Sequence, residues 1–148
     1  MALYQSYTWN YRLEVPPYER LMAVLEAFFA SYPGGDYDVD ERDRYKLSFR
    51  RGNWRKSLLG LGPRVPDRLV PGEFVLWPLV VRVLVRPAPD AFAITIRYEL
   101  YLPRSMKALK PETQAAVHQH ALKELDDLAA YLAQCLPLAS PPEVIPVK

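Results

Sequence analysis

The stretch VVRVLVRPAPDAFAITIRYEL, residues 80–100, contains two runs in which apolar and polar side chains alternate with a period of two. In the first run Val81, Val83 and Val85 share one face, with arginines on the other. In the second run the apolar face carries Phe92, Ile94, Ile96, Tyr98, Leu100 and, just beyond the stretch, Leu102. Such alternation is typical of strands with one buried face, and the short turn at 88–90 joins the runs as an antiparallel hairpin. We therefore expect a sheet whose second face is polar and uncovered.

Elements on both sides of this hairpin follow from the same periodicities and from proline and glycine at their ends. The sequence predicts strands over residues 7–15, 36–43 and 44–51, the second of them a short edge strand, and helices over 18–32 and 111–136. The first strand of the hairpin is expected to begin at Phe74, and Pro78 indicates a bulge or an edge position near its start. Gly52 and Asn53 indicate a turn, and residues 54–72 show no sustained period. A connection of this length is typical of functional or flexible segments.

The predicted order of elements is β-α-β-β-β-β-α, with strands joined largely as hairpins. We predict an α+β fold: a two-layer sandwich in which two helices, including a long C-terminal one, cover one face of an antiparallel sheet of about four to five strands. Residues 1–136 form a single domain in this interpretation, and residues 137–148 form a proline-rich extended tail.

This order resembles that of the START-type helix-grip domains, in which a curved antiparallel sheet wraps a long C-terminal helix. The resemblance is one of element order, since the chain has fewer strands than that fold and one helix where the fold has two after its first strand. It implies a variant of the sandwich with a ligand cavity between the sheet and the long helix.

The cysteine and histidine content argues against a disulfide framework and against a metal site. Cys135 is the single cysteine among 148 residues, and His118 and His120 are the only histidines. Two positions apart on a helix, these histidines point in different directions and cannot share a metal ion. We expect no metal and no cofactor. The lone cysteine and the lack of a signal-peptide pattern fit a cytoplasmic protein, and the most apolar stretch, 74–85, is too short to span a membrane.

Known catalytic motifs are absent from the sequence. There is no G-x-S-x-G or C-x-x-C pattern, and LGLGPR (59–64) is not a Walker A loop. The acidic run DYDVDERD (36–43) lacks the central glycine and the closing glutamate of an EF-hand calcium loop. Glu14 and Glu99 lie on the polar faces of strands and are interpreted as surface residues. The sequence therefore gives no positive case for an enzyme.

Positive charge is concentrated between Arg42 and Arg68, where nine Lys or Arg and two Asp give +7, while the rest of the chain carries −5. The candidate binding residues in this segment are Arg50, Arg51, Trp54, Arg55 and Lys56. Clustered cations beside an aromatic ring suit contacts with phosphates and stacked bases, an anionic membrane or a protein partner. Arg51 falls on the inward-facing side of strand 44–51, so it either lies at the rim of the core or has a specific partner.

Aromatic side chains are concentrated on the predicted inner face of the sheet. The candidates for lining a ligand cavity are Tyr7, Trp9, Tyr11, Tyr45, Phe49 and Tyr98. Buried tyrosine hydroxyls need hydrogen-bond partners. This face therefore either lines a cavity or belongs to a solid core whose tyrosines reach its rim.

Three functional hypotheses follow, and the first is favoured. The protein is a non-catalytic interaction or accessory module, which contacts a protein partner or a second copy of itself through the basic-aromatic loop 50–64 and an open sheet edge. Alternatively, it is a carrier or enzyme for a small apolar molecule held in a helix-grip-like cavity. The third hypothesis is binding of nucleic acid or an anionic membrane through the same loop, although the acidic remainder of the chain opposes nonspecific nucleic-acid binding.

Overall fold

The computed structural model describes the backbone of residues 2–11, 18–32, 37–55, 64–70, 72–88, 91–136 and 143–147. Side chains are described over the same ranges, except at positions 2–7, 9–11, 75, 88, 91 and 143–147. Within these ranges the strands are β1 (Ala2–Tyr11), β2 (Asp38–Arg42), β3 (Lys46–Arg51), β4 (Leu79–Ala88), β5 (Ala91–Leu100) and β6 (Glu143–Val147). The α-helices are α1 (Tyr18–Ser31) and α2 (Pro111–Cys135).

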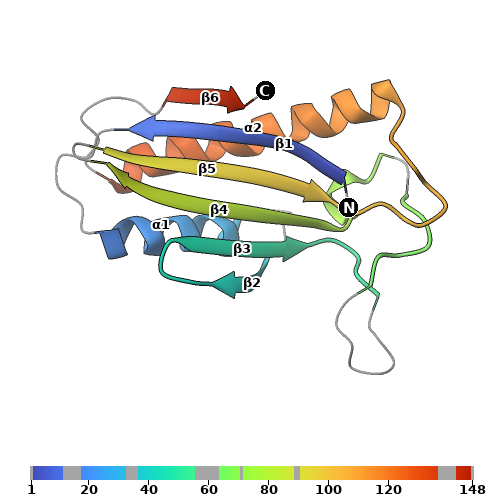
Figure 1. Cartoon of the computed structure of the whole chain (residues 1–148), viewed down its shortest axis with the longest axis horizontal. Coiled ribbons are helices and arrows are strands. Elements are labelled where there is room, and N and C mark those ends of the chain that lie inside the picture. The colour runs from blue at the N-terminus through green and yellow to red at the C-terminus, as the bar shows by residue number, and fades with distance from the viewer. Residues whose placement is uncertain are drawn as a thin grey trace.

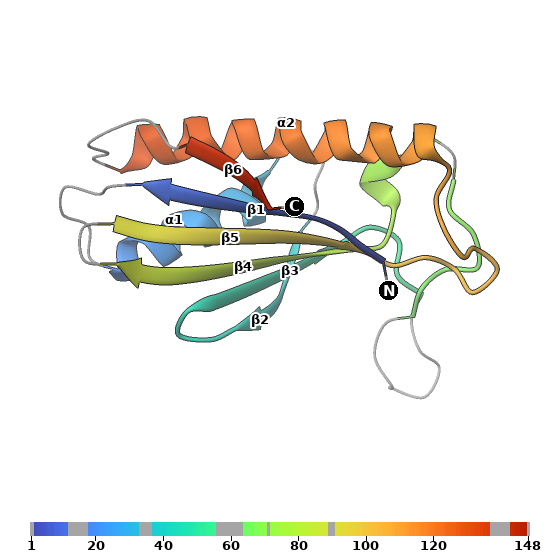
Figure 2. The ribbon, with the colours of Figure 1, turned by 45° about the horizontal axis from the view of Figure 1, so that its top comes forward.

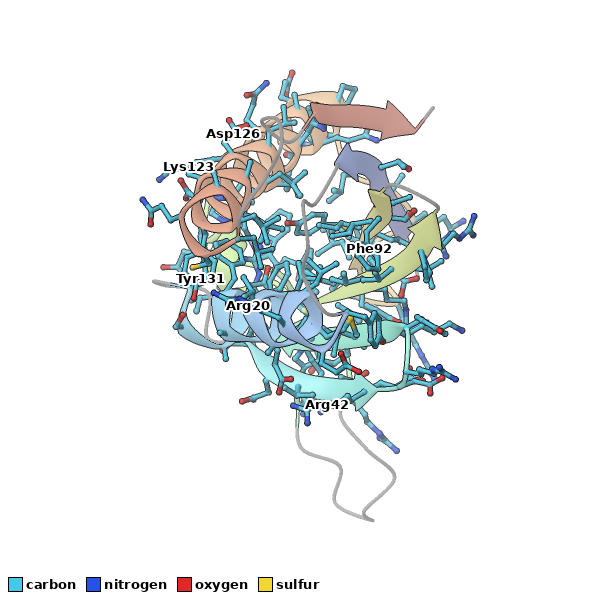
Figure 3. The ribbon with its side chains drawn as sticks, turned by 90° about the vertical axis from the view of Figure 1, so that its left-hand side faces the viewer. Arg20, Arg42, Phe92, Lys123, Asp126 and Tyr131 are labelled. Carbon is cyan, nitrogen blue, oxygen red and sulfur yellow. The ribbon has the colours of Figure 1, made fainter. Side chains whose placement is uncertain are left out.

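The sheet and the helices form two layers (Figure 1). Neighbouring strands follow the order β2-β3-β4-β5-β1-β6, and every neighbouring pair is antiparallel. Viewed from one end of the sheet, α1 and α2 lie on the same side of it (Figure 3). Figure 2 shows α2 running along the sheet on that side, so that neither helix covers the opposite face, which we call the open face. The predicted α+β sandwich is therefore confirmed.

The β4–β5 hairpin lies at the centre of the core, as the alternation over residues 80–100 predicts. Val83 on β4 pairs with Ile96 on β5, and both are at most 1 % exposed. Phe29 on α1 stacks on Phe49 of β3 with 4.7 Å between ring centroids, and Leu128 on α2 joins the same core. Burying each such side chain contributes about 1.5–3 kcal/mol, so this face of the sheet stabilises the two-layer arrangement.

The first strand of the hairpin begins later than its sequence predicts. Residues Phe74–Leu76 form a short 3-10 helix, η1, and β4 starts at Leu79. Pro78 has no backbone N–H to donate to a neighbouring strand, so strand pairing begins only after it. The indole Nε1 of Trp77 donates a hydrogen bond of 2.8 Å to the Val70 carbonyl, which fixes the chain just before β4.

The described part of the chain forms a six-stranded sheet, one strand more than the four to five that we predict. The proline-rich tail is expected to follow the domain as an extended segment, but residues 143–147 pair with β1 as β6. Pro146 lies opposite Tyr7 in this pairing. An edge strand tolerates proline, because the missing N–H costs no hydrogen bond on the free side. Within the described ranges, β2 and β6 are the two edges of the sheet.

Arg51, at the end of β3, points into the molecule, and only 4 % of it is exposed. Its Nη1 lies 3.3 Å from Oε2 of Glu124, which is 1 % exposed on the packed face of α2. The Tyr37 hydroxyl donates a hydrogen bond to the other carboxylate oxygen of Glu124, and its ring centre lies 5.1 Å from the Arg51 guanidinium. Of the two alternatives for Arg51, a specific partner is therefore the correct one.

Burial dominates the electrostatics of this cluster of Tyr37, Arg51 and Glu124. It raises the pKa of the Glu124 carboxyl above its ordinary value, although the Arg51 charge and the Tyr37 hydrogen bond both act to lower it. Burial likewise raises the pKa of Tyr37 well above its ordinary value. Because removing two charges from water costs about as much as their pairing returns, we infer that the cluster fixes the position of β3 on α2 more than it adds net stability.

Replacing Arg51 by methionine tests the role of this cluster. Arg51→Met leaves Glu124 as a buried carboxylate without its cation, so the free energy of unfolding should fall by about 3–5 kcal/mol. Arg50→Met is the matched control, because Arg50 points to the open face and its 3.4 Å ion pair with Asp40 is partly exposed. The control should lose less than about 1 kcal/mol. Urea denaturation followed by circular dichroism gives both values, and equal losses would contradict the structural role of Arg51.

Candidate binding site on the open face of the sheet

The binding residues predicted from the sequence do not all lie on one surface. Arg50 and Arg51 are consecutive on β3, and successive side chains of a strand point to opposite faces. Arg50 therefore lies on the open face, while Arg51 is buried against Glu124. Lys56 lies outside the described residues. Trp54 and Arg55 remain as neighbours of Arg50 at the surface.

The turn after β3 requires a glycine. Gly52 has a φ of +90°, which residues with a side chain rarely adopt, and a Cβ at this position would lie 2.1 Å from the Trp77 carbonyl oxygen. The next residue, Asn53, donates its backbone N–H to the Leu76 carbonyl at 2.8 Å. The chain leaving β3 is thus fixed against the η1 segment, and this fixed turn determines where Trp54 lies.

Three contacts hold the half-buried ring of Trp54. Its indole Nε1 donates a hydrogen bond of 2.8 Å to the Arg51 carbonyl. The ring meets Tyr101 edge-on, with centroids 5.1 Å apart and planes at 61°. The Arg50 guanidinium lies 5.9 Å from the ring centroid, within the range of a cation–π contact. Trp54 therefore folds back onto the open face and does not extend into solvent.

Glu99 on β5 is a buried hydrogen-bond acceptor on the open face. Arg82 donates through Nε to Oε2 of Glu99 at 2.9 Å, and the Tyr101 hydroxyl donates to the same oxygen at 3.4 Å. The hydrogen bond to Glu99 raises the pKa of Arg82. Glu99 is only 2 % exposed, so its interpretation as a surface residue is wrong, even though it lies on the predicted polar face. Sequence alternation assigns the face of a strand, but neighbouring side chains decide whether that face is solvated.

A groove of ≈ 810 Å³ opens beside Trp54 and Tyr101. Arg55 and Arg64 both line it, and two backbone hydrogen bonds of 2.8 and 2.9 Å join these residues as an isolated antiparallel bridge. Arg104 lines the groove from the segment that follows β5. We call the surface formed by Trp54, Arg55, Arg64, Tyr101 and Arg104 the arginine–aromatic groove.

The arginine–aromatic groove carries an excess of positive charge. Asp67 also lines it, and one of its carboxylate oxygens lies 2.7 Å from Nη1 of Arg55. Both side chains are more than half exposed, so this ion pair contributes little to stability. Within the described ranges, neither Arg64 nor Arg104 pairs with a carboxylate. Guanidinium groups offer parallel N–H donors in a plane, which is the geometry that carboxylates and phosphates accept.

Tyr101 and Arg104 belong to the groove but were not predicted from the sequence, and Arg64 ends the predicted loop 50–64 without being among its named binding residues. β3 and β5 run in the same direction, because each is antiparallel to β4. Their C-terminal ends therefore lie at the same end of the sheet, and the segments that follow them meet there. The order of the strands was the one signal that could have brought these two segments together, because neither of them contains a recognisable motif.

The predicted cavity residues are described only in part. Phe49 and Tyr98 are at most 1 % exposed and belong to the packed core. Tyr45 is half-buried, and its ring centroid lies 5.2 Å from that of Tyr18. The side chains of Tyr7, Trp9 and Tyr11 lie outside the described residues. A cavity lined by the aromatic side chains of β1 therefore stays a prediction.

Side chains capable of acid–base or thiol chemistry also lie outside the groove. His120 on α2 is half-buried, its Nε2 has no hydrogen-bond partner among the described residues, and burial lowers its pKa. Cys135 is a half-buried thiol near the end of the same helix. In the part of the chain with defined placement, no group of three or more His, Cys, Asp or Glu side chains is arranged to hold a metal ion. Nor does any helix in that part combine the length and apolarity needed to cross a membrane.

Comparison with known proteins assigns the chain to no family. No family model matches it, and no curated protein matches it as a relative. A function therefore has to be argued from the geometry and charge of the site itself.

Trp54 and Tyr101 are expected to be energetically coupled. An edge-to-face aromatic pair contributes about 0.5–1.5 kcal/mol beyond area burial, so a double-mutant cycle of Trp54→Ala and Tyr101→Ala should give a coupling of that size. Urea denaturation of the four proteins supplies the free energies of unfolding. A control cycle of Trp54→Ala with Tyr45→Ala should be additive, because these residues flank opposite ends of β3. Additivity in the first cycle would mean that the aromatic pair is not formed in solution.

Proposed function

We propose that the protein is a non-catalytic binding module and that it holds an acidic segment of a partner protein in the arginine–aromatic groove. The observation that carries this proposal is the position of Arg64 and Arg104, which have no carboxylate partner among the described residues and line a groove beside the ring of Trp54. Tryptophan, tyrosine and arginine are the residue types that most often dominate the energetics of protein interfaces.

The aromatic part of the groove favours binding because it is already ordered. Trp54 is fixed by its hydrogen bond to the Arg51 carbonyl and by its contact with Tyr101. Tyr101 in turn donates to the buried Glu99. Association loses affinity for every flexible side chain that it must order, so rings held in place before binding reduce that cost.

The charge of the groove indicates the chemistry of the partner. Three arginines and one aspartate line it, and the exposed pair between Arg55 and Asp67 can be replaced at little cost. Carboxylates of an incoming segment can accept paired hydrogen bonds from Arg64 and Arg104. An apolar side chain in the same segment can pack against Trp54. A segment that alternates acidic and apolar residues therefore fits the groove best.

The edge strand β2 is a less suitable docking element. All five of its residues are exposed, and three of them are Asp38, Asp40 and Glu41. Charged edge strands resist the addition of another strand. We therefore assign partner binding to the groove, and treat self-association through a sheet edge as an outcome that experiment distinguishes.

Fluorescence anisotropy with a fluorescein-labelled decapeptide of alternating Glu and Leu tests this function. The peptide should bind saturably at low ionic strength and more weakly as salt is added, because exposed charge pairs are screened. Replacing Arg64 and Arg104 together by glutamine should weaken binding at least tenfold, which corresponds to about 1.4 kcal/mol. Arg86→Gln is the matched control, since Arg86 is exposed on β4 outside the groove and its loss should leave the affinity unchanged.

The same titration with a labelled oligothymidylate and with phosphatidylserine vesicles separates the alternatives. Tighter binding to either of these probes than to the peptide would contradict the proposal and favour the nucleic-acid or membrane hypothesis. Equal peptide binding by the wild type and the double variant would also contradict it. Light scattering after size exclusion shows whether a second copy of the chain is the partner, and a dimer that excludes the peptide would replace the proposal with self-association.

A further inference from the structure

A second hollow, of ≈ 290 Å³, lies on the open face over β3, β4 and β5. It shares no lining residue with the arginine–aromatic groove. Arg82 on β4 and Arg97 on β5 are direct cross-strand partners at this position, and Ser48 on β3 is the partner of Arg82 on the other side. Lys46 on β3 also lines the hollow. Three cations from three adjacent strands thus surround one small concave surface.

The arginine pair is only partly neutralised by the protein. Like charges directly opposite each other destabilise a strand pair unless something lies between them. Glu99 is that group: its Oε2 lies 2.9 Å from Nε of Arg82, but its Oε1 lies 3.9 Å from Nη1 of Arg97, which is beyond a hydrogen bond. Glu41 on β2 is 3.8 Å from Nη1 of Arg82 and likewise makes no hydrogen bond. Together the three cations and these two carboxylates leave one positive charge in excess.

Hydrogen-bond donors remain available around the hollow. A guanidinium has five N–H groups. Arg82 uses Nε for Glu99 and Nη1 for the Ser48 hydroxyl, 3.2 Å away. No carboxylate among the described residues lies within hydrogen-bond distance of Arg97, whose side chain is half exposed. Arg82 cannot turn away to bind a ligand elsewhere, because its bonds to the buried Glu99 and Ser48 fix its position. Arg82 is therefore held in a fixed position, whereas the N–H donors of Arg97 remain available to a ligand.

We infer that this hollow is a binding site for a small monocarboxylic acid with a short apolar body. One carboxylate neutralises the single excess charge, and its two oxygens match the paired donors of a guanidinium. A doubly charged phosphate would overcompensate this single excess charge. Leu84, which is half-buried between Lys46 and Thr95 in the cross-strand register, supplies an apolar surface for the rest of the ligand. The volume lies at the lower limit of ligand pockets, about 300 Å³, and so suits a small molecule.

Sodium butyrate is the probe for this site, titrated into isotope-labelled protein at constant ionic strength. The amide signals of Ser48, Arg82 and Arg97 should shift saturably, with a dissociation constant in the millimolar range or tighter. Butyramide, which has the same shape without the charge, and sodium phosphate should not saturate these shifts. Saturation with butyramide would show that charge is not recognised, and saturation with phosphate alone would show that the ligand class is wrong. Either result would overturn the inference.

Variants locate the site and separate it from the groove. Arg97→Gln should weaken butyrate binding at least tenfold, whereas Arg86→Gln, on the open face but outside the hollow, should leave it unchanged. The double variant Arg64→Gln and Arg104→Gln should bind butyrate as the wild type does. Loss of butyrate binding in that double variant would place the carboxylate in the groove and refute a second site. Because the acidic peptide and butyrate are measured separately, either proposal can fail while the other holds.

Discussion

The burial of one side of β3, where Leu47, Phe49 and Arg51 point toward the helices, determines which face of the molecule each part of the basic segment reaches. Because Arg51 is held inside against α2, the alternation of β3 places Arg50 on the open face. The turn at Gly52 then carries the chain back, and the Arg51 carbonyl receives the hydrogen bond from the Trp54 indole. The main chain of one buried residue thus positions the aromatic ring of the surface groove. A segment that reads as one basic motif is divided between the core and a surface.

On the open face a second buried carboxylate, that of Glu99, likewise holds surface side chains in place. Glu99 accepts hydrogen bonds from Arg82 and Tyr101, so it orders one residue of the small hollow and one residue of the groove. Glu124, on the packed side of the sheet, binds Arg51 at the end of β3. Glu99, on the open face, binds Arg82 in the middle of the sheet. Glu99 leaves Arg97 nearby without a hydrogen-bonded carboxylate among the described residues. Among the described residues, cations outnumber carboxylates both at the small hollow and in the groove, even though the chain as a whole has a net charge of only +2.

Local periodicity explains what could be predicted from the sequence, and tertiary contacts explain what could not. The hairpin over residues 80–100 and the apolar stripe of α2 follow from spacing. The inward parity of Arg51 left two alternatives, the rim of the core or a specific partner, and the structure shows the partner. Glu124 lies three residues after the buried Ala121, so its position in the stripe was visible, but it became informative only with Arg51 beside it. The burial of Glu99, the pairing of β6 and the meeting of Arg64 with Arg104 all depend on segments distant in the chain. The spacing of residues within one segment therefore cannot predict these three features.

In the proposed function Arg51 acts through the fold, whereas Arg64 and Arg104 act by contact with a partner. Replacing Arg51 by methionine, Glu124 by leucine and Tyr37 by phenylalanine in one protein removes every polar group of the buried cluster and keeps its volume. Exchanging a buried ion pair for apolar residues of similar size is often neutral for stability, so this triple variant should fold. The decisive measurement is its dissociation constant for the acidic decapeptide. We expect the wild-type value, and a folded triple variant that binds tenfold more weakly would contradict this expectation by placing Arg51 in the binding site.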